Sequence, residues 1–325
     1  MNVRPARPVD MADLPVQRPS APTTTAQARA RFFNSGNAFN VVLPAVPAHV
    51  FVDEAAQALA ATHSAWFDCD QSAQLDCEFA ATTPLMLARY ARVAAGDSLA
   101  VDAMATGSIG YVIAGDACCS GGDAELILAA GDVVLLPGGA RYRLQGGPDG
   151  VLLWMVGNQP QLAFEGLQPA LPPRVSLELV HYPAAEIARQ LDFLFEAGTN
   201  DATSGHALIF SSERHEASRN LMPTLTLSYN TLPPHAAQRA HRHNSAAVTL
   251  IIQGRACHSL VGGQRCDWVP WSTMVTPPGA PHSHHNDGDG RALFLIVQDG
   301  GLHYHARTMG FEFLPLASPT ACTSR

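Results

Sequence analysis

The sequence predicts a mainly β protein made of two tandem barrels, with a few helices linking them. Short β-rich runs separated by glycine fill residues 84–157 and again residues 223–299, and such spacing is typical of a sandwich or small barrel. The two segments also align with each other. GYVIAG ending at Gly115 matches TLIIQG ending at Gly254, and AAGDVVLLPGGARY ending at Tyr142 matches VPWSTMVTPPGAPH ending at His282. The separation along the chain is nearly the same for both pairs of stretches, which indicates duplicated domains.

Composition supports a folded protein and excludes some partners. The chain has 325 residues, 47% of them apolar and 15% charged, which is enough for two ordinary domains with full cores. The net charge of −8, without a cluster of Lys and Arg, argues against nucleic acid as a partner. No run approaches the ~20 apolar residues of a membrane-spanning helix, so we expect no membrane segment.

The seven cysteines show no CxxC pair and no regular spacing. An odd, irregular set in a chain of this length indicates reduced thiols, which predicts a cytoplasmic protein. The opening segment is rich in Pro, Ala and Thr and has no apolar core of the kind found in a signal peptide.

These features predict four regions in chain order. Residues 1–35 form a disordered lead, and residues 36–165 form the N-terminal barrel. Residues 166–220 form a linker with an amphipathic helix from Pro183 to Gly198, because Ile187, Leu191 and Leu194 recur at helical spacing. We expect that helix to pack across the join. Residues 221–316 form the C-terminal barrel.

Five histidines fall in two short stretches, AHRHNSAAVTLIIQG (residues 240–254) and PPGAPHSHHND (residues 277–287). Residues two apart on a β-strand point to the same side, so His241 and His243 can both face a barrel interior while Arg242 faces outward. His282 follows the turn PPGAP on another strand. Imidazole is a common ligand of first-row transition metals, so the spacing predicts a three-histidine metal site with open positions.

The repeat provides a comparison within the chain. Shifted back by one repeat, the three histidine positions become Asp102, Met104 and Tyr142, and no imidazole remains. The N-terminal barrel is therefore predicted to lack this site and to form an interface or a cover.

These residues resemble the cupin family, whose motifs have the forms G-x5-HxH-x3,4-E-x6-G and G-x5-PxG-x2-H-x3-N. The matching residues are His241, His243, Gly254, Pro277, Gly279, His282 and Asn286. The resemblance implies cupin (double-stranded β-helix, jelly-roll) barrels. Two motif positions differ: Ala247 stands at the Glu position, and Trp271 stands at the leading glycine of the second motif. Loss of the Glu leaves a three-His site, which in this family typically holds Fe(II) and activates O2.

The segment from Leu208 to Phe313 further resembles bicupin ring-cleaving dioxygenases, namely the gentisate, salicylate and 1-hydroxy-2-naphthoate 1,2-dioxygenases. The similar stretches are MPT, AHRHNSAAVTLIIQG, DWVPWSTMVTPPGAPHSHHND, LFLIVQD and RTMGFEF. The resemblance implies an oxidoreductase of aromatic catabolism, with Fe(2+) held by His241, His243 and His282. It would open a salicylate- or gentisate-like ring between the carboxyl- and hydroxyl-bearing carbons with O2, giving a 2-oxo acid.

His284 lies two residues beyond His282, so an extended strand would turn both rings to one side. The resemblance implies that His284 is a catalytic acid/base, while a solvated loop histidine is the alternative. His285 is expected to face outward. His303 and His305 repeat the HxH spacing without an evident third ligand, and one of them is expected to line the pocket. Trp268 and Trp271 are expected to pack inside the barrel.

The substrate-binding residues depart from the family pattern. The usual arginine six residues beyond the second ligand histidine is Thr249 here, and the usual upstream Gln corresponds to Asn230. Either Arg239 or Arg255 holds the carboxylate instead, or the substituents differ, as in a 5-substituted salicylate or an aminophenol-like substrate. Asp299 and His303 complete the predicted set.

Three functional hypotheses remain open. The first is the iron ring-cleaving dioxygenase, expected to form a homotetramer as its relatives usually do. The second is another three-His iron cupin oxygenase acting on an aminophenol, a thiol or a diketone. The third is a non-enzymatic cupin that senses a ligand or stores one, although no helix-turn-helix or basic segment is present to transmit a signal to DNA.

Overall fold

The computed structural model describes residues 10–102, 104–122, 124–171, 177–197 and 205–315. The chain divides into two compact units, residues 1–44 and 45–325. The first unit holds a short 3-10 helix η1 (Met11–Asp13), a one-turn helix α1 (Thr25–Ala28) and an isolated bridge between Gln17 and Phe32. The predicted disorder of residues 1–35 stays a prediction, and the first nine of them lie outside the described residues.

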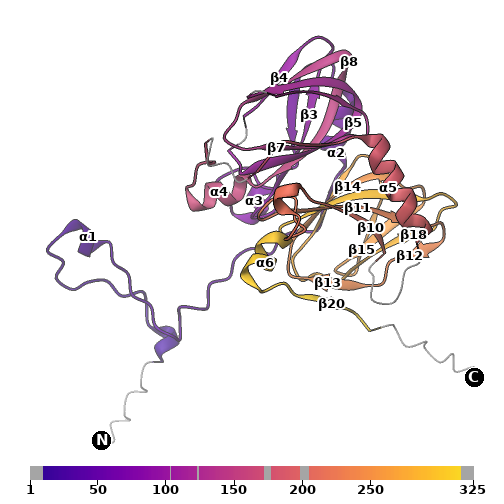
Figure 1. Ribbon diagram of the computed structural model, residues 1–325. Coiled ribbons are helices and arrows are strands. Elements are labelled where there is room, and N and C mark those ends of the chain that lie inside the picture. Colours follow the sequence, from indigo (N-terminus) through magenta and orange to yellow (C-terminus); the bar gives the residue numbers. More distant parts are fainter. Residues whose placement is uncertain (1–9, 103, 123, 172–176, 198–204, 316–325) are drawn as a thin grey trace, which may run out of the picture. The chain divides into compact units, whose positions relative to one another are not determined.

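The second unit holds both barrels, which confirms the predicted fold class (Figure 1). In the N-terminal barrel, one sheet runs in the order β2 (Ala65–Asp68), β3 (Leu87–Val93), β8 (Tyr142–Gly157), β5 (Gly107–Gly121), β7 (Val133–Pro137) and β9 (Val180–Tyr182). The long strands β5 and β8 bend at bulges and continue around the barrel, where β4 (Ser98–Val101) and β6 (Ala124–Ala129) join them. Three short helices flank these strands: α2 (Val52–Ala60), α3 (Ser72–Leu75) and α4 (Gln159–Glu165).

The C-terminal barrel consists of two sheets. The sheet nearer the first barrel runs β1 (His49–Phe51), β17 (Thr273–Thr276), β14 (Ala247–Gln253), β19 (Ala292–Gln298), β11 (Thr226–Leu232) and β10 (His206–Phe210). The other sheet runs β16 (Gln264–Asp267), β15 (Cys257–Val261), β18 (His282–Asn286), β13 (His241–His243) and β20 (Phe311–Phe313), with β12 (Ala236–Ala237) paired to β18. Helix α6 (Gly300–Ala306) follows β19, and the 3-10 helix η2 (Glu213–His215) follows β10.

The two barrels repeat one strand order. The series β2, β3, β8, β5, β7 of the first corresponds to β10, β11, β19, β14, β17 of the second. A sixth strand completes each sheet. Strand β1, which precedes the first barrel in the chain, pairs with β17 of the second barrel, and β9, which follows the first barrel, pairs with β7 of that barrel. Because β1 covers the edge of the second barrel's sheet, the exact domain boundaries stay a prediction.

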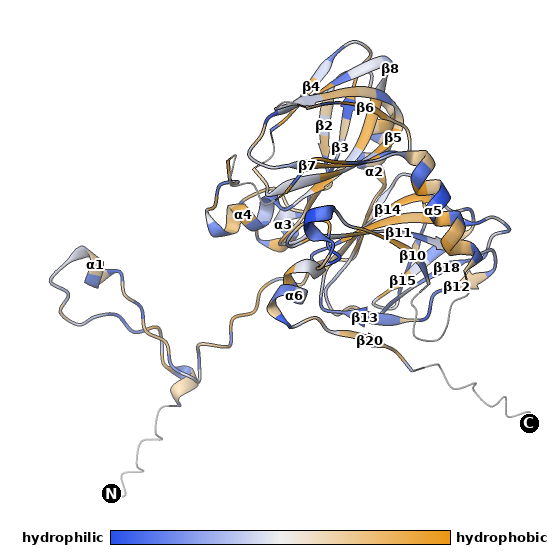
Figure 2. Ribbon diagram, in the orientation of Figure 1, coloured by the Kyte–Doolittle hydropathy of each residue, from blue (hydrophilic) through white to orange (hydrophobic). Residues whose placement is uncertain are grey.

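Alternation along the inner sheet gives it two different faces. Leu227, Leu250, Leu295 and their neighbours join Tyr90 and Trp154 of the first barrel in one continuous hydrophobic core. The residues between them point to the opposite face, into the C-terminal barrel, because successive side chains of a strand alternate. Figure 2 shows the contrast between the mostly hydrophobic β14 and the hydrophilic β13 of the other sheet. The sheet is thus buried on both sides.

Helix α5 (Ala184–Glu196) confirms the predicted amphipathic helix, with Ile187 and Leu191 buried; Gly198 lies outside the described residues. Its first N–H, that of Ala184, donates to the Asp132 carboxylate of the first barrel at 2.8 Å. Near its other end, Arg291 of the second barrel donates to Asp192 at 2.8 Å. The helix therefore fastens one barrel to the other, as expected (Figure 1).

Trp271 adopts the left-handed backbone conformation, with φ +70°. The corresponding turn of the first barrel has Gly131 there, with φ +91°, as the cupin motif would have a glycine. This conformation disfavours a side chain by about 1–2 kcal/mol. The Trp271 ring stacks on Tyr111 of the first barrel, with centroids 6.4 Å apart, so it packs between the barrels and not, as predicted, inside one.

Six cysteines lie in the described part of the chain, and all six are free, in line with the predicted reduced thiols. Across the same residues, no helix combines the length and apolar character needed to span a membrane.

A buried hydroxyl at the join gives the first testable expectation. Thr273 accepts from Trp154 Nε1 at 2.9 Å and contacts Tyr90 Oη at 2.8 Å, with all three side chains buried. Thr273→Val leaves the indole N–H without its partner, so we expect the free energy of unfolding to fall by about 1–3 kcal/mol. Urea denaturation followed by circular dichroism measures this loss.

The matched control is Thr249→Val on the adjacent strand β14. Thr249 is equally buried, but its hydroxyl has no hydrogen-bond partner among the described residues. Its removal should leave stability unchanged or slightly higher. Equal losses from both variants would contradict a structural role for the Thr273 hydroxyl.

Candidate metal centre

Strands β13 and β18 bring three histidines together. On β13, His241 and His243 are buried and Arg242 is exposed, where it pairs with Glu312 of β20 at 2.7 Å. His282 of β18 lies opposite His241 in the ladder. One ligand nitrogen from each of His241, His243 and His282 lies within 4.8 Å of the other two. The predicted inward alternation of HRH is confirmed, and the three rings form a group able to hold a metal ion.

Backbone carbonyls fix the tautomer of all three rings. The Nδ1 atoms of His241, His243 and His282 each lie 2.9 Å from a carbonyl oxygen, those of Arg239, Ser245 and Ala280 in turn. A carbonyl only accepts, so each Nδ1 carries the proton and each Nε2 keeps its lone pair. Gln298 Nε2 lies 3.3 Å from His243 Nε2, as a donor to that lone pair would. The rings are therefore oriented and prepared for metal coordination.

The electrostatic setting keeps the rings neutral. Burial lowers the pKa of His241 and His243, and burial followed by the nearby His241 lowers the pKa of His282 to about 3. Metal ions bind the neutral imidazole, so protons compete weakly at neutral pH. The donor set of three neutral nitrogens, without carboxylate or thiolate, suits a divalent first-row metal.

The motif residues around the ligands have structural roles. Gly279 takes φ +72° in the turn before His282, and its N–H donates to the His243 carbonyl at 2.7 Å. This bond ties the turn to the other ligand strand. The Asn286 amide donates to carbonyls in two loops, including Gly290 at 2.8 Å, and so holds the far end of β18.

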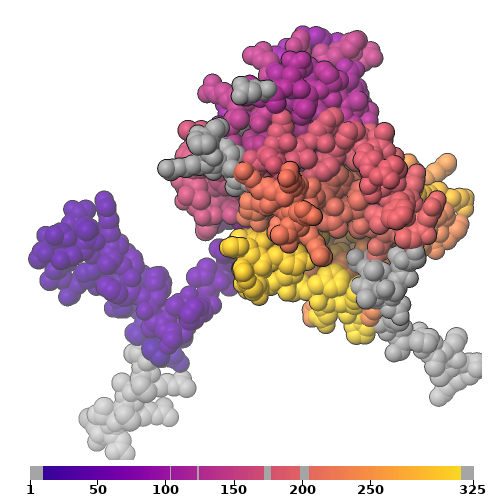
Figure 3. All heavy atoms as spheres, in the orientation of Figure 1, coloured from indigo at the N-terminus to yellow at the C-terminus, as the bar shows by residue number. Residues whose placement is uncertain are grey.

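A cavity of about 460 Å³ opens beside the three rings. Its walls come from the inner face of the β11, β14 and β19 sheet, from β18, and from segments around residues 218–220 and 304–311. Figure 3 shows these last two segments, orange and yellow, meeting on one face of the molecule. Several lining groups are polar, and the volume accommodates a small aromatic ligand.

His284 lines the same cavity in the opposite tautomer. Its Nδ1 lies 2.7 Å from Ser259 Oγ, which itself accepts from Trp268 Nε1 at 2.8 Å. The indole can only donate, and His284 Nδ1 is the acceptor within reach of the Ser259 hydroxyl hydrogen. We infer that His284 carries its proton on Nε2. Burial lowers the pKa of His284 well below its ordinary value, so the ring is neutral.

Asn230 and Thr249 also line the cavity, as expected for substrate-binding residues. Asn230 Nδ2 donates to Ser228 Oγ at 2.8 Å and to the Ser228 carbonyl at 3.3 Å, which leaves the Asn230 side-chain carbonyl available. Thr249 Oγ1 is buried and has no partner among the described residues. The same is true of Gln238 Oε1 on the opposite wall. Unpaired buried polar atoms facing a cavity are ready partners for a ligand.

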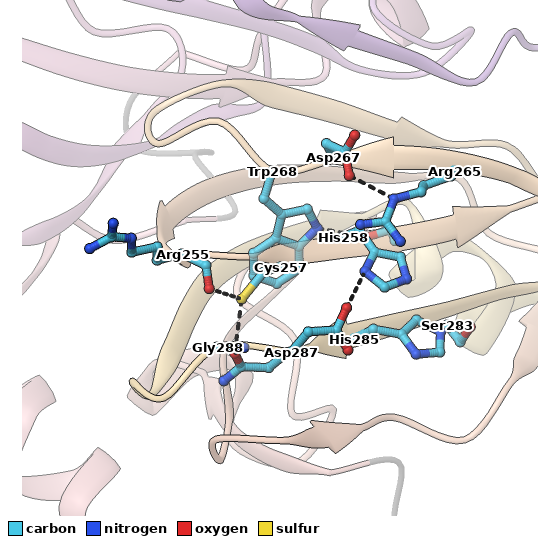
Figure 4. Close-up of polar contacts among 12 residues, drawn as sticks. Arg255, Cys257, His258, Arg265, Asp267, Trp268, Ser283, His285, Asp287 and Gly288 are labelled. Atoms are coloured by element: carbon cyan, nitrogen blue, oxygen red, sulfur yellow. Dashed lines mark hydrogen bonds and ion pairs between the residues drawn. The ribbon is translucent and has the colours of Figure 1, made fainter.

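The other predicted substrate-binding residues do not line this cavity. Arg239 is exposed and lies over the Phe313 ring at 4.6 Å. Arg255 is exposed at the start of β15, and in Figure 4 its side chain points away from the other labelled residues. Their proposed grip on a carboxylate stays a prediction that this arrangement does not favour, because neither guanidinium lies in the cavity wall.

Asp299 and His303 lie beside the metal centre but outside the cavity wall. The buried Asp299 carboxylate accepts from the Ala246 N–H at 2.8 Å and so braces the turn after the HRH strand. His303 Nδ1 lies 3.1 Å from the Asn244 amide in the same region. His303 and His305 sit on helix α6, not on a strand, and within the described residues only His241, His243 and His282 form a metal-binding group.

His285 lies on the outer side of β18, as expected. It stacks on His258 of β15, with ring centroids 4.6 Å apart and planes 7° from parallel. Figure 4 shows this pair, with Asp287 reaching His258 at 3.3 Å.

The ladder corrects the comparison between barrels by one residue. Val101 pairs with Tyr142 as His241 pairs with His282, so Val101 replaces Asp102 as the counterpart, and residue 103, which replaces Met104, lies outside the described residues. The cause is that the first strand of this pair is shifted by one residue relative to the alignment of the two sequence repeats. Neither Asp102 nor Met104 faces inward, since both are exposed, and the conclusion that the N-terminal barrel lacks the three-histidine group is unchanged.

Sequence reasoning missed several functional groups. Ser259 and Trp268 support His284, and alternation along CHSLV could have placed Ser259 inside. Arg219 and Gln238 enter the cavity wall from irregular segments, which carry no periodic signal.

Comparison with known proteins agrees with this geometry. Residues 228–298 match the family model of the cupin domain. This match covers strands β11 to β19 of the C-terminal barrel. The whole fold resembles that of salicylate 1,2-dioxygenase from Pseudaminobacter salicylatoxidans, with a TM-score of 0.71, 12% sequence identity, and coverage of 85% of this chain and 91% of that one.

Sequence relatives carry the predicted resemblance. The chain is 31% identical over 104 residues to a gentisate 1,2-dioxygenase of Ralstonia sp, covering 32% of this chain and 27% of that protein. It is 28% identical over 122 residues to a 5-aminosalicylate 1,2-dioxygenase of Comamonas sp, covering 37% and 32%. The predicted resemblance to 1,2-dioxygenases is thus confirmed, while the aligned part spans about a third or less of these relatives' length.

Asp299 gives a pH-dependent expectation. Burial raises the pKa of Asp299 from 3.8 to about 7, so between these values the folded state binds a proton that the unfolded state releases. Stability from this group is therefore present at low pH and is lost as pH rises toward 7. Asp299→Asn keeps an acceptor for Ala246 without the charge. Because the loss begins above the unfolded pKa of 3.8, we expect the variant to be more stable than the parent at both pH 5 and pH 8, and the difference to be larger by about 2–3 kcal/mol at pH 8.

Urea unfolding at the two pH values measures this difference, with exposed Asp149→Asn as the control. A gap between Asp299→Asn and the parent that stays constant with pH would contradict the raised pKa.

Proposed function

We propose that the protein is an Fe(II)-dependent dioxygenase that opens the ring of a salicylate- or gentisate-like hydroxybenzoate between the carboxyl- and hydroxyl-bearing carbons. The observation that carries the proposal is the convergence of three histidine rings able to hold a metal ion, and of a fourth ring, His284, around a single cavity. The names of the relatives, gentisate, 5-aminosalicylate and 1-hydroxy-2-naphthoate 1,2-dioxygenases, support the substrate class.

His241, His243 and His282 would hold the iron. Bound Fe(II) would supply open positions for the substrate's phenolate and carboxylate and for O2, and a path for electrons from the ring to O2. The ligands bring no charge of their own, and no Asp or Glu is among the described residues that line the cavity. A doubly anionic chelating substrate would therefore meet a site of opposite charge.

The other cavity residues would orient the substrate. Neutral His284 would donate a hydrogen bond from Nε2 to an oxygen of the bound reactants, while the Ser259 and Trp268 chain keeps that hydrogen in place. Asn230 and Thr249 offer uncharged hydrogen-bonding groups to ring substituents. Fixing ring and O2 in one geometry removes much of the entropic cost of their encounter. Both oxygen atoms would end in the product, a ring-opened 2-oxo acid.

A homotetramer and a cytoplasmic location remain part of the proposal. The alternatives, another three-His oxygenase acting on an aminophenol, a thiol or a diketone, or a ligand-sensing cupin, share the metal group. Thr249, which is neutral, stands where the resembled dioxygenases carry an arginine, so an aminophenol substrate without a carboxylate stays an alternative.

The test is oxygen uptake by protein loaded anaerobically with Fe(II). We expect uptake with salicylate, gentisate or a 5-substituted salicylate, equal in moles to the ring-opened product seen by ultraviolet absorbance. Chelation and His241→Ala should abolish uptake and bound iron together, whereas His258→Ala, outside the centre, should keep both. Uptake only with an aminophenol, a thiol or a diketone would favour the second reading, and tight binding without any uptake would favour the sensor.

His284 yields an expectation of its own. We expect His284→Phe to lower kcat by roughly 10²–10³-fold, because loss of a positioned hydrogen-bond donor has effects of this size. Ser259→Ala, which leaves the ring but frees its tautomer, should give a smaller loss. Iron content, measured by mass spectrometry, should stay at the parental level in both. Loss of iron from His284→Phe would instead identify His284 as a ligand.

A further inference from the structure

One charged side chain other than histidine lines the cavity in the described part of the chain, and it is Arg219. Its guanidinium has no hydrogen bond, ion pair or ring contact within the described residues. Most arginines of the second barrel are engaged elsewhere, as Arg242 is with Glu312 and Arg291 with Asp192. An unpaired guanidinium at a cavity wall is available to a ligand.

The backbone holds Arg219 at this place. Its N–H donates to the His215 carbonyl at 2.9 Å, and its φ of +56° lies in the left-handed region, which turns the chain toward the cavity. The next residue, Asn220, is buried and its carbonyl accepts from Ser211 Oγ at 3.0 Å. Leu221 follows in the hydrophobic core. A left-handed arginine persists only where its surroundings impose it, so the position is set by the fold.

Among the cavity-lining residues that the structure describes, no second arginine or lysine competes for an acidic ligand. The strand position that carries an arginine in the resembled dioxygenases holds the neutral Thr249. Arg239 lies over Phe313, and Arg255 is outside the lining. An acid bound beside the metal therefore meets, apart from the ion, a single guanidinium.

We propose that Arg219 binds the carboxylate of the substrate and makes the site selective for acids over their neutral analogues. This inference rests on the proposed function. A guanidinium matches a planar carboxylate with two parallel N–H donors, which gives orientation as well as affinity. Arg219 is exposed before binding, so a ligand that covers it strengthens the pair by excluding water. Arg219 would thus take over the missing arginine's role from a loop.

The experiment compares two ligands of the same shape that differ in charge. Anaerobic calorimetry measures binding of salicylate and of salicylamide to the iron-loaded full chain. We expect Arg219→Met to weaken salicylate binding by about 10–100-fold and salicylamide binding by less than about threefold. Arg219→Lys, which keeps the charge without the fork, should be intermediate. Arg141→Met, an exposed arginine of the first barrel, should bind both like the parent.

Three results would overturn the inference: unchanged salicylate binding, equal weakening of both ligands, or a loss in Arg255→Met in place of Arg219→Met. Because binding needs no turnover, this test is separate from that of the proposed function. Charge-selective binding that depends on Arg219 without oxygen uptake would refute the dioxygenase and leave the carboxylate site standing.

Discussion

The arrangement of this protein depends on one sheet that is buried on both faces. Leucines and valines at alternate positions of β11, β14 and β19 pack against the first barrel, and the intervening Thr, Ser, Asn and Gln side chains face the cavity. A one-residue slip of any of these strands would exchange the two sets. The first barrel, which lacks the three histidines, is therefore needed for the metal centre of the second, because it covers an apolar face that water would otherwise meet.

The metal centre is built as much by the backbone as by the histidines. Carbonyl oxygens of Arg239, Ser245 and Ala280 take the Nδ1 protons, so any residues with the same backbone path would serve. His284 differs because its Nδ1 faces a side-chain hydroxyl, Ser259, instead of a carbonyl. A carbonyl at Nδ1 imposes a lone pair on Nε2, whereas a hydroxyl that accepts from Trp268 and donates to Nδ1 leaves the hydrogen on Nε2. The same residue type thus acquires two roles from its hydrogen-bond partner.

The sequence predicted the duplicated barrels, the linking helix and the three converging histidines, because each has a periodic signal: internal repeat, helical spacing, or alternation on a strand. The proposed carboxylate partner, Arg219, was not predicted. Arg239 and Arg255 were proposed from nearness in sequence to the HRH strand, but nearness along a chain does not place a side chain in a cavity. Arg219 lies in an irregular loop and itself adopts the left-handed backbone conformation. No periodic pattern in the sequence predicts such a loop. Asp299 was named for the cavity and instead braces a turn, since a buried carboxylate is served by the nearest free N–H.

Comparison of the two barrels shows which residues must change together to convert an apolar strand pair into one that presents a hydrogen-bond donor to the cavity. Cys119 pairs with Leu144 in the first barrel, and both belong to its apolar core; the corresponding pair in the second is Ser259 with His284. Histidine alone at Leu144's place would leave a buried ring nitrogen without a partner, at a cost of roughly 1–3 kcal/mol. Serine alone would leave a buried hydroxyl in the same state. Only the pair, completed by the Trp268 N–H, satisfies every polar atom while presenting one hydrogen to the cavity. His284, which donates the hydrogen bond, and Ser259, which orients the ring, therefore form one unit, and each satisfies a polar atom of the other.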